Sequence, residues 1–157
     1  MKKRVPLFSL FALALLTSFT SAAQPEPVDF KTIDNYSLKN DVRLAPGFNC
    51  MVLINPAQFN KAFTPAKTGT NSTALPDFTT QRVIAIALPP TMRKTSLIID
   101  KIEMSGSIAY VHFREVLAEN LTTKMTPLTI ASFDRASFIK TVAFYKDKHL
   151  VKSFPVK

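Results

Sequence analysis

RVIAIAL, residues 82–88, decides the fold of this 157-residue chain. A strand with one face in water alternates apolar and polar side chains, whereas a strand covered on both faces is apolar throughout. After its first residue this stretch is apolar at every position, and Pro89 and Pro90 follow it. Proline cannot donate a hydrogen bond to a neighbouring strand, so the strand should end there. We therefore expect residues 82–88 to form a strand that is covered on both faces.

Further strands are expected on both sides of this stretch, because short apolar or alternating segments recur between polar turns. The segments are YSLKNDVRL (36–44), FNCMVLI (48–54), SLIIDKIEM (96–104), SIAYVHFREV (107–116), TIASF (129–133), SFIKTVAFY (137–145) and HLVKSFPV (149–156). Ser105 and Gly106 are typical of the tight turn of a hairpin. The polar segment ENLTTKMTP, residues 119–127, is expected to be a loop.

One short helix is predicted within NPAQFNKAF, residues 55–63. Asn55 is a favourable cap, and Pro56 suits the first helical position. Gln58 stands three residues after the cap, as in a capping box. Apolar residues then recur at the i, i+3 and i+4 spacing of one helix face: Phe59, Ala62 and Phe63.

Together these elements predict an α+β fold, a mostly antiparallel β-sheet system of about seven strands with one short helix packed on it. We expect a single domain over residues 36–157. The polar, proline-bearing residues 24–35 are expected to form a flexible N-terminal tail. Residues 64–76 are rich in Thr, Ser, Asn and Pro and are expected to form an exposed loop.

The first 23 residues have the three parts of a secretory signal peptide. Cations at residues 2–4 precede an apolar run at residues 7–16, and Ser21 and Ala23 fit the small-x-small cleavage rule. The run is shorter than the roughly 20 apolar residues of a membrane span. We expect cleavage near Ala23 and a periplasmic or secreted protein with no membrane span in the mature chain. An uncleaved anchor is the alternative.

Charge and composition argue against several kinds of partner. Without residues 1–23, 17 Lys and Arg stand against 11 acids, a net charge of about +6, and the cations are spread along the chain. A nucleic-acid binder usually gathers its cations on one face, so we expect no nucleic-acid partner. His112 and His149 lack ligating neighbours at metal-site spacing. Cys50, within an apolar segment, is expected to be a small buried hydrophobic residue.

The catalytic motifs that sequence can reveal are not found. The glycines are scattered, so the chain has no phosphate-cradling loop and no nucleophile elbow. The acids stand singly, which argues against a hydrolase with paired carboxylates. We therefore expect no catalytic residues, no metal and no cofactor. Asp100 is unusual, because it interrupts an apolar strand; either a bulge turns it outward or a cation such as Lys94 pairs with it.

Residues 91–96 connect the strand expected at residues 82–88 with the next one, and they are basic and glycine-free. The two preceding prolines stiffen the exit from the strand, so a tight or semi-rigid connection would display Met92, Arg93 and Lys94. An ordinary solvated turn is one interpretation. The other is a recognition loop for an acidic or peptide-like partner, with these three residues as the partner-binding site.

The chain resembles the PrcB-like family, the domain at the C-terminal end of a subunit of a bacterial secreted protease complex. The resembling segments are VLINPAQFNKAF (52–63), LPDFTTQRVIAIAL (75–88), IIDKIEMSGSIAYVHFREVL (98–117) and MTPLTIASFDRASFIKTVAFYKD (125–147). Family members commonly carry paired glycines after the buried strand, where this chain has LPPTMRKTSL. The resemblance implies an exported, non-catalytic partner of a protease or another envelope protein, and it transfers no catalytic residue.

The expected function is therefore an exported protein-binding module, such as an accessory or inhibitory subunit of a protease complex. Two alternatives remain open. One is a small-ligand-binding envelope protein, which needs an apolar pocket between the sheet and the helix. The other is a hydrolase whose Ser, His and Asp meet only in the folded chain.

Overall fold

The computed structural model describes residues 24–66 and 75–156. The signal peptide expected at residues 1–23, and most of the loop expected at 64–76, lie outside these ranges. The described residues form eleven strands and one helix. The fold class is confirmed as mostly β with antiparallel sheets and one short helix, but the expected number of about seven strands is wrong. No helix in the described ranges is long and apolar enough to cross a membrane.

The strands form two main sheets and one small sheet. The larger sheet has five strands in the order β1 (Glu26–Val28), β7 (Thr91–Ser105), β8 (Ile108–Met125), β10 (Thr141–Lys146) and β11 (His149–Pro155). The second has four, in the order β2 (Phe30–Thr32), β9 (Leu128–Asp134), β6 (Gln81–Ala87) and β4 (Asn49–Leu53). The small sheet pairs β3 (Tyr36–Leu38) with β5 (Phe63–Pro65), and the helix α1 is Pro56–Ala62. Strands β8 and β10 pair in parallel, and the other pairs are antiparallel.

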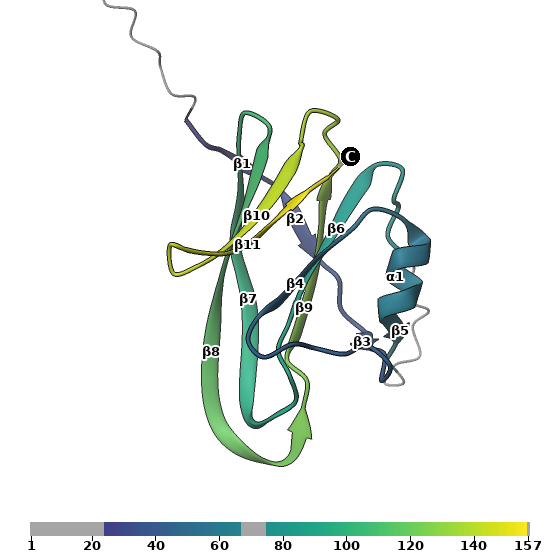
Figure 1. The fold of residues 1–157 in the computed structure, drawn as a ribbon, viewed down its shortest axis with the longest axis vertical. Coiled ribbons are helices and arrows are strands. Elements are labelled where there is room, and N and C mark those ends of the chain that lie inside the picture. The colour runs from purple at the N-terminus through teal and green to yellow at the C-terminus, as the bar shows by residue number, and fades with distance from the viewer. Residues whose placement is uncertain (1–23, 67–74, 157) are drawn as a thin grey trace, which may run out of the picture.

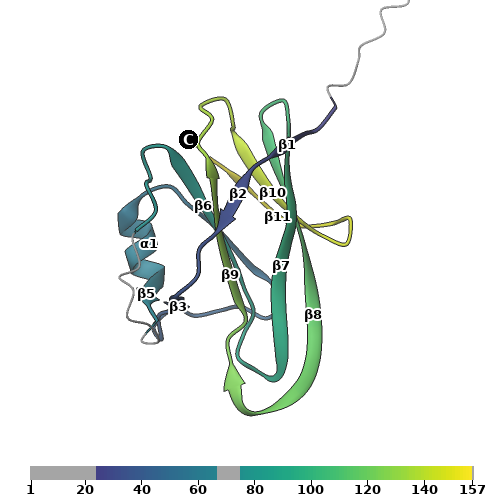
Figure 2. The same ribbon diagram turned by 180° about the vertical axis from the view of Figure 1, so that it is seen from behind.

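Strand β6 is central because both of its faces are covered. Ile84 and Ile86 belong to an apolar cluster shared by the two main sheets. Val83 and Ala85 belong to a second cluster with residues of α1 and β5. Figures 1 and 2 show the resulting layers, with the four-stranded sheet between the five-stranded sheet and α1. The expectation of a strand covered on both faces is confirmed.

Helix α1 begins as its sequence predicts. The Asn55 side chain accepts a hydrogen bond of 2.9 Å from the backbone N–H of Gln58. The Gln58 side chain in turn accepts one of 3.0 Å from the backbone N–H of Ile54. Phe59 is fully buried and packs edge-to-face against Tyr36, with ring centroids 4.9 Å apart. Phe59 thereby joins α1 to the small sheet.

Residues 24–35 do not form the expected tail over their whole length. Strand β1 pairs with β7, and β2 pairs with β9, so this segment forms one edge of each main sheet. Val28 and Phe30 pack against the core between the sheets. Each strand has three residues, which is too short for the alternating pattern that marks a strand in sequence.

Candidate functional site

Residues 91–96 form the start of β7 rather than the expected connection. Only residues 88–90 link β6 to β7, and β8 extends to Met125, opposite Thr91. Residues 91–96 pair with residues 116–125 of β8. Threonine, which is favoured in strands, recurs in 91–96 and 119–125, although the polarity of both segments indicates loops. We call this paired region, residues 91–97 and 116–125, the hairpin base. It continues beyond the ends of β10 and β11 (Figure 1).

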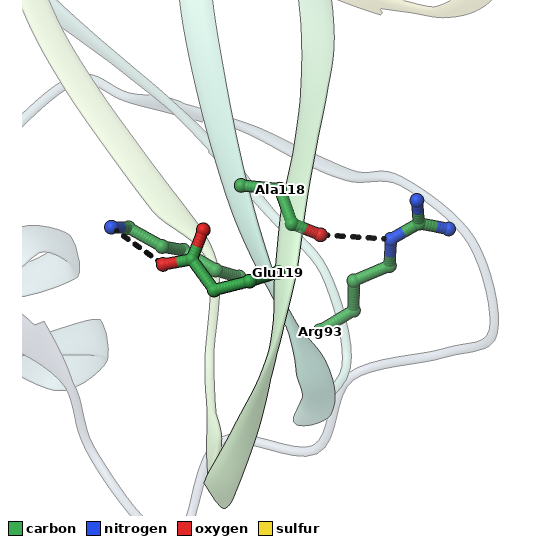
Figure 3. Close-up of polar contacts among 4 residues, drawn as sticks. Arg93, Ala118 and Glu119 are labelled. Carbon is green, nitrogen blue, oxygen red and sulfur yellow. Dashed lines mark hydrogen bonds and ion pairs between the residues drawn. The ribbon is translucent and has the colours of Figure 1, made fainter.

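The three predicted partner-binding residues are all exposed in the hairpin base. The Arg93 side chain donates from Nε to the carbonyl oxygen of Ala118, at 3.2 Å. Lys94 Nζ lies 3.1 Å from Glu119 Oε1. Figure 3 shows Arg93 on one side of the hairpin and Glu119, the partner of Lys94, on the other. Successive side chains of a strand point to opposite faces, as those of Arg93 and Lys94 do here. Met92 is 44% exposed. The strand therefore presents Arg93 and Lys94 to opposite faces of the hairpin.

A cleft of about 450 Å³ runs beside the hairpin base. Residues 93–99 of β7 form one wall, and residues 125–129, leading from β8 into β9, form another. Thr32 and Asp34, which follow β2, also line the cleft. The cleft follows the edge of the strand, so both Arg93 and Lys94 line it although their side chains point to opposite faces, whereas Met92 is not part of its lining.

The edge of β7 along this cleft is open in the described part of the chain. Strand β1 pairs with β7 only at residues 102–104, so residues 91–101 have β8 as their one strand neighbour. An edge of this kind presents backbone N–H and C=O groups that an extended segment can pair with. Sequence alone did not indicate this edge, because it depends on where β1 stops.

The charged side chains of the hairpin base interact only weakly with one another. The side chains of Lys94 and Glu119 are 58% and 66% exposed, and an ion pair in water contributes little to stability. A backbone hydrogen bond and then the bond from Lys94 hold the pKa of the Glu119 carboxyl below its usual value. Lys94 can therefore exchange Glu119 for a carboxylate of a partner at small cost.

A second polar cluster lies where β7, β8 and β10 adjoin. Glu103 accepts from Lys101 at 2.7 Å and lies 3.2 Å from Nε2 of His112. The ring of His112 stacks on Tyr145, with centroids 5.6 Å apart. The hydrogen bond from Lys101 is the main cause that lowers the pKa of the Glu103 carboxyl, and the charge of Lys101 adds to it. The sequence predicts that His112 lies in a strand. Which residues of the adjacent strands contact it is decided by strand pairing.

Cys50 is buried, as expected, and burial raises the pKa of its thiol to about 12. Within the described ranges, no three His, Cys, Asp or Glu side chains gather closely enough to hold a metal ion. No protein-family model matches this chain, and comparison with curated proteins and with solved structures finds no match either.

Proposed function

We propose that this protein is an exported, non-catalytic module that binds another protein along the open edge of β7. The observation that carries the proposal is the edge of residues 91–101, which lies beside a cleft and pairs with no further strand of the described residues. An extended peptide segment can add itself to such an edge as a further strand, and its backbone then supplies the hydrogen bonds. The cleft gives room for the side chains on one face of that segment.

The chemistry of the hairpin base indicates what such a segment carries. Arg93 and Lys94 suit carboxylates, because charge-assisted hydrogen bonds are the strong ones. Apolar side chains also lie exposed there, Leu117 at 46% and Met125 at 58%. The partner segment is therefore extended and carries both acidic and apolar residues. By its resemblance to the PrcB-like family, the partner is an envelope protease or a protein associated with one.

The same charges also have a protective effect. Lys and Arg on a sheet edge hinder pairing between two copies of a chain. Protection against self-association and binding of a partner predict different behaviour for a variant that lacks both charges. If the charges only protect, Arg93→Ala/Lys94→Ala self-associates and keeps its partners.

A small-ligand role is the second candidate, and one feature favours it. An open, largely apolar groove of about 360 Å³ lies between β4 and α1. Val52 and Leu53 line it from β4, and Ala62 lines it from α1. Organic extraction of the purified protein followed by mass spectrometry tests this role, since a carrier would retain an apolar molecule.

The decisive experiment for the binding role compares three proteins in pull-downs from an envelope fraction: wild type, Arg93→Ala/Lys94→Ala, and the control Arg43→Ala/Lys61→Ala. Both variants lose two exposed cations, so non-specific charge effects are equal. We expect the control to capture the wild-type partners and the first variant to recover them about tenfold less well. Equal capture by all three would refute the role of Arg93 and Lys94.

The open edge is tested by crosslinking. Cys50 is the single cysteine of the chain and is buried, so a cysteine introduced by Met92→Cys is the accessible one. It should crosslink the captured partner, whereas Leu150→Cys on β11 should not. A serine-directed activity probe that labels the protein would instead support the hydrolase alternative. Export is tested by the intact mass of the secreted protein, which should begin near Gln24.

A further inference from the structure

Arg82, in β6, is buried, and one nitrogen of its guanidinium lacks a hydrogen-bond partner among the described residues. Its exposed fraction is 3%. Its Nη1 atom has no hydrogen-bond partner in the described part of the chain. Arginine is rarely buried unless it is paired, because removing a charge from water costs free energy. A buried guanidinium with one unpartnered nitrogen is suited to binding an anion.

The acidic side chains of this chain do not supply that anion. All 11 Asp and Glu residues lie in the described ranges, and none of the ion pairs among those ranges includes Arg82. Asp77, the nearest acid before it in sequence, is engaged elsewhere. Its carboxylate accepts from the hydroxyl of Thr79 at 2.6 Å and from that of Thr80 at 2.8 Å. These hydrogen bonds hold the pKa of Asp77 below its usual value, those from Thr79 most of all.

Arg82 lines a cavity of about 650 Å³ together with two further cations, Arg135 and Lys140. The hydroxyl-bearing residues Thr79 and Ser137 also line it. Burial lowers the pKa of the Arg82 guanidinium, and the like charge of Arg135 lowers it further. Among the described residues, three cations thus line one cavity to which no carboxylate contributes.

Backbone hydrogen bonds hold the walls of this cavity in place. The N–H of Arg135 donates to the carbonyl of Thr80 at 2.8 Å, and its side chain donates to the carbonyl of Phe78 at 3.3 Å. The N–H of Lys140 donates to Ser107, and the carbonyl of Lys140 accepts from Val156, each at 2.8 Å. The cations are therefore brought together by β6, by the segment after β9 and by the end of β11, so the site is built by the fold.

We propose that this cavity binds the phosphate group of a small molecule. A phosphate group presents more acceptor oxygens and more negative charge than a carboxylate, and arginine binds it through two parallel hydrogen bonds. Arg82, Arg135 and Lys140 supply the positive charge, and the hydroxyls of Thr79 and Ser137 add neutral donors. The site is separate from the cleft beside β7, so it does not depend on the proposed protein partner.

The test measures binding of inorganic phosphate at constant ionic strength, by titration calorimetry and by the melting temperature. We expect saturable binding to wild type at one site and a rise in melting temperature, because a ligand that binds only the folded state stabilises it. Arg82→Met keeps an unbranched side chain but removes the charge. It should bind phosphate at least tenfold more weakly and gain no thermal stability from it.

Two controls make the result specific. Arg43→Met removes an exposed arginine outside the cavity and should bind phosphate as wild type does. Without phosphate, Arg82→Met should melt at or above the wild-type temperature, because it removes a buried unpaired charge. If it unfolds instead, Arg135→Ala and Lys140→Ala, both at exposed positions, take its place and should each weaken binding.

The comparison of anions decides the ligand class. Equal stabilisation by chloride or acetate overturns the proposal, and so does undiminished phosphate binding by the variants. The proposal is also overturned if wild type does not bind phosphate. The exception is that wild type sediments with phosphatidic acid vesicles and Arg82→Met does not. That last result assigns the phosphate to a lipid headgroup.

Discussion

The Nε atom of Arg114 donates a 2.8 Å hydrogen bond to Oδ1 of Asp100, across β7 and β8. Asp100 is the extra residue of a β-bulge: Ile99 pairs with Phe113, and Lys101 pairs with His112, the next residue along β8. Ile99 and Ile102 can therefore both be buried although they are three residues apart. Both explanations offered for Asp100 hold, since a bulge turns it outward and a cation pairs with it, but the cation is Arg114 and not Lys94.

Deleting Asp100 should leave the fold intact, because the remaining residues of β7 then alternate regularly with the same side chains inward. The loss is the exposed pair with Arg114, which contributes less than about 1 kcal/mol. Deleting Ile98 instead moves Leu97 from its buried position to the opposite face, at a cost of about 2 kcal/mol or more. Urea unfolding of both deletions measures this, and a deletion of Asp100 that is the more damaging of the two contradicts the bulge.

Ile86→Asp should abolish cooperative folding. Ile86 is fully buried between the two main sheets, and an unpaired buried charge costs about 3–5 kcal/mol against a total stability of about 5–15 kcal/mol. Leu150→Asp makes the same chemical change at a residue that is 55% exposed, and it should change the melting temperature little. Thermal unfolding followed by circular dichroism compares the two. A wild-type melting temperature for Ile86→Asp would place that side chain outside the core.

The stability of the protein should fall at high pH partly because of Cys50. Burial raises the pKa of its thiol from 9.0 to about 12. Between these values the folded protein keeps a proton that the unfolded chain has released, so the free energy of unfolding decreases as pH rises, by at most about 1.4 kcal/mol per pH unit. Below pH 9 both states are protonated and this contribution does not vary.

Denaturant unfolding of wild type and Cys50→Ala between pH 8 and pH 11 measures the effect. The difference between the two proteins should change with pH above about pH 9 and stay constant below it. Lysines and tyrosines that titrate in this range are common to both proteins, so their contribution cancels. Parallel curves across the whole range would contradict the raised pKa.

Local sequence was enough for the features that depend on neighbouring residues. Seven residues around β6 are apolar almost without interruption, which is possible only for a strand with a layer on each face. The Asn55 cap and the Gln58 side chain define the start of α1 within four residues. Cys50 could be assigned to the interior because it stands in an apolar segment. In each case the interaction that decides the structure is local or depends on burial alone.

Tertiary structure decided the features that depend on pairing between distant segments. Residues 91–96 and 119–125 are typical of loops by their polarity, and they are strands because residues 91–96 pair with residues 116–125. Strands β1 and β2 have three residues each and form only against β7 and β9. Arg82 reads as the polar end of an apolar strand, and its burial beside Arg135 and Lys140 appears only in the fold. Strand pairing and cavity walls join residues that lie far apart in sequence, so no local pattern encodes them.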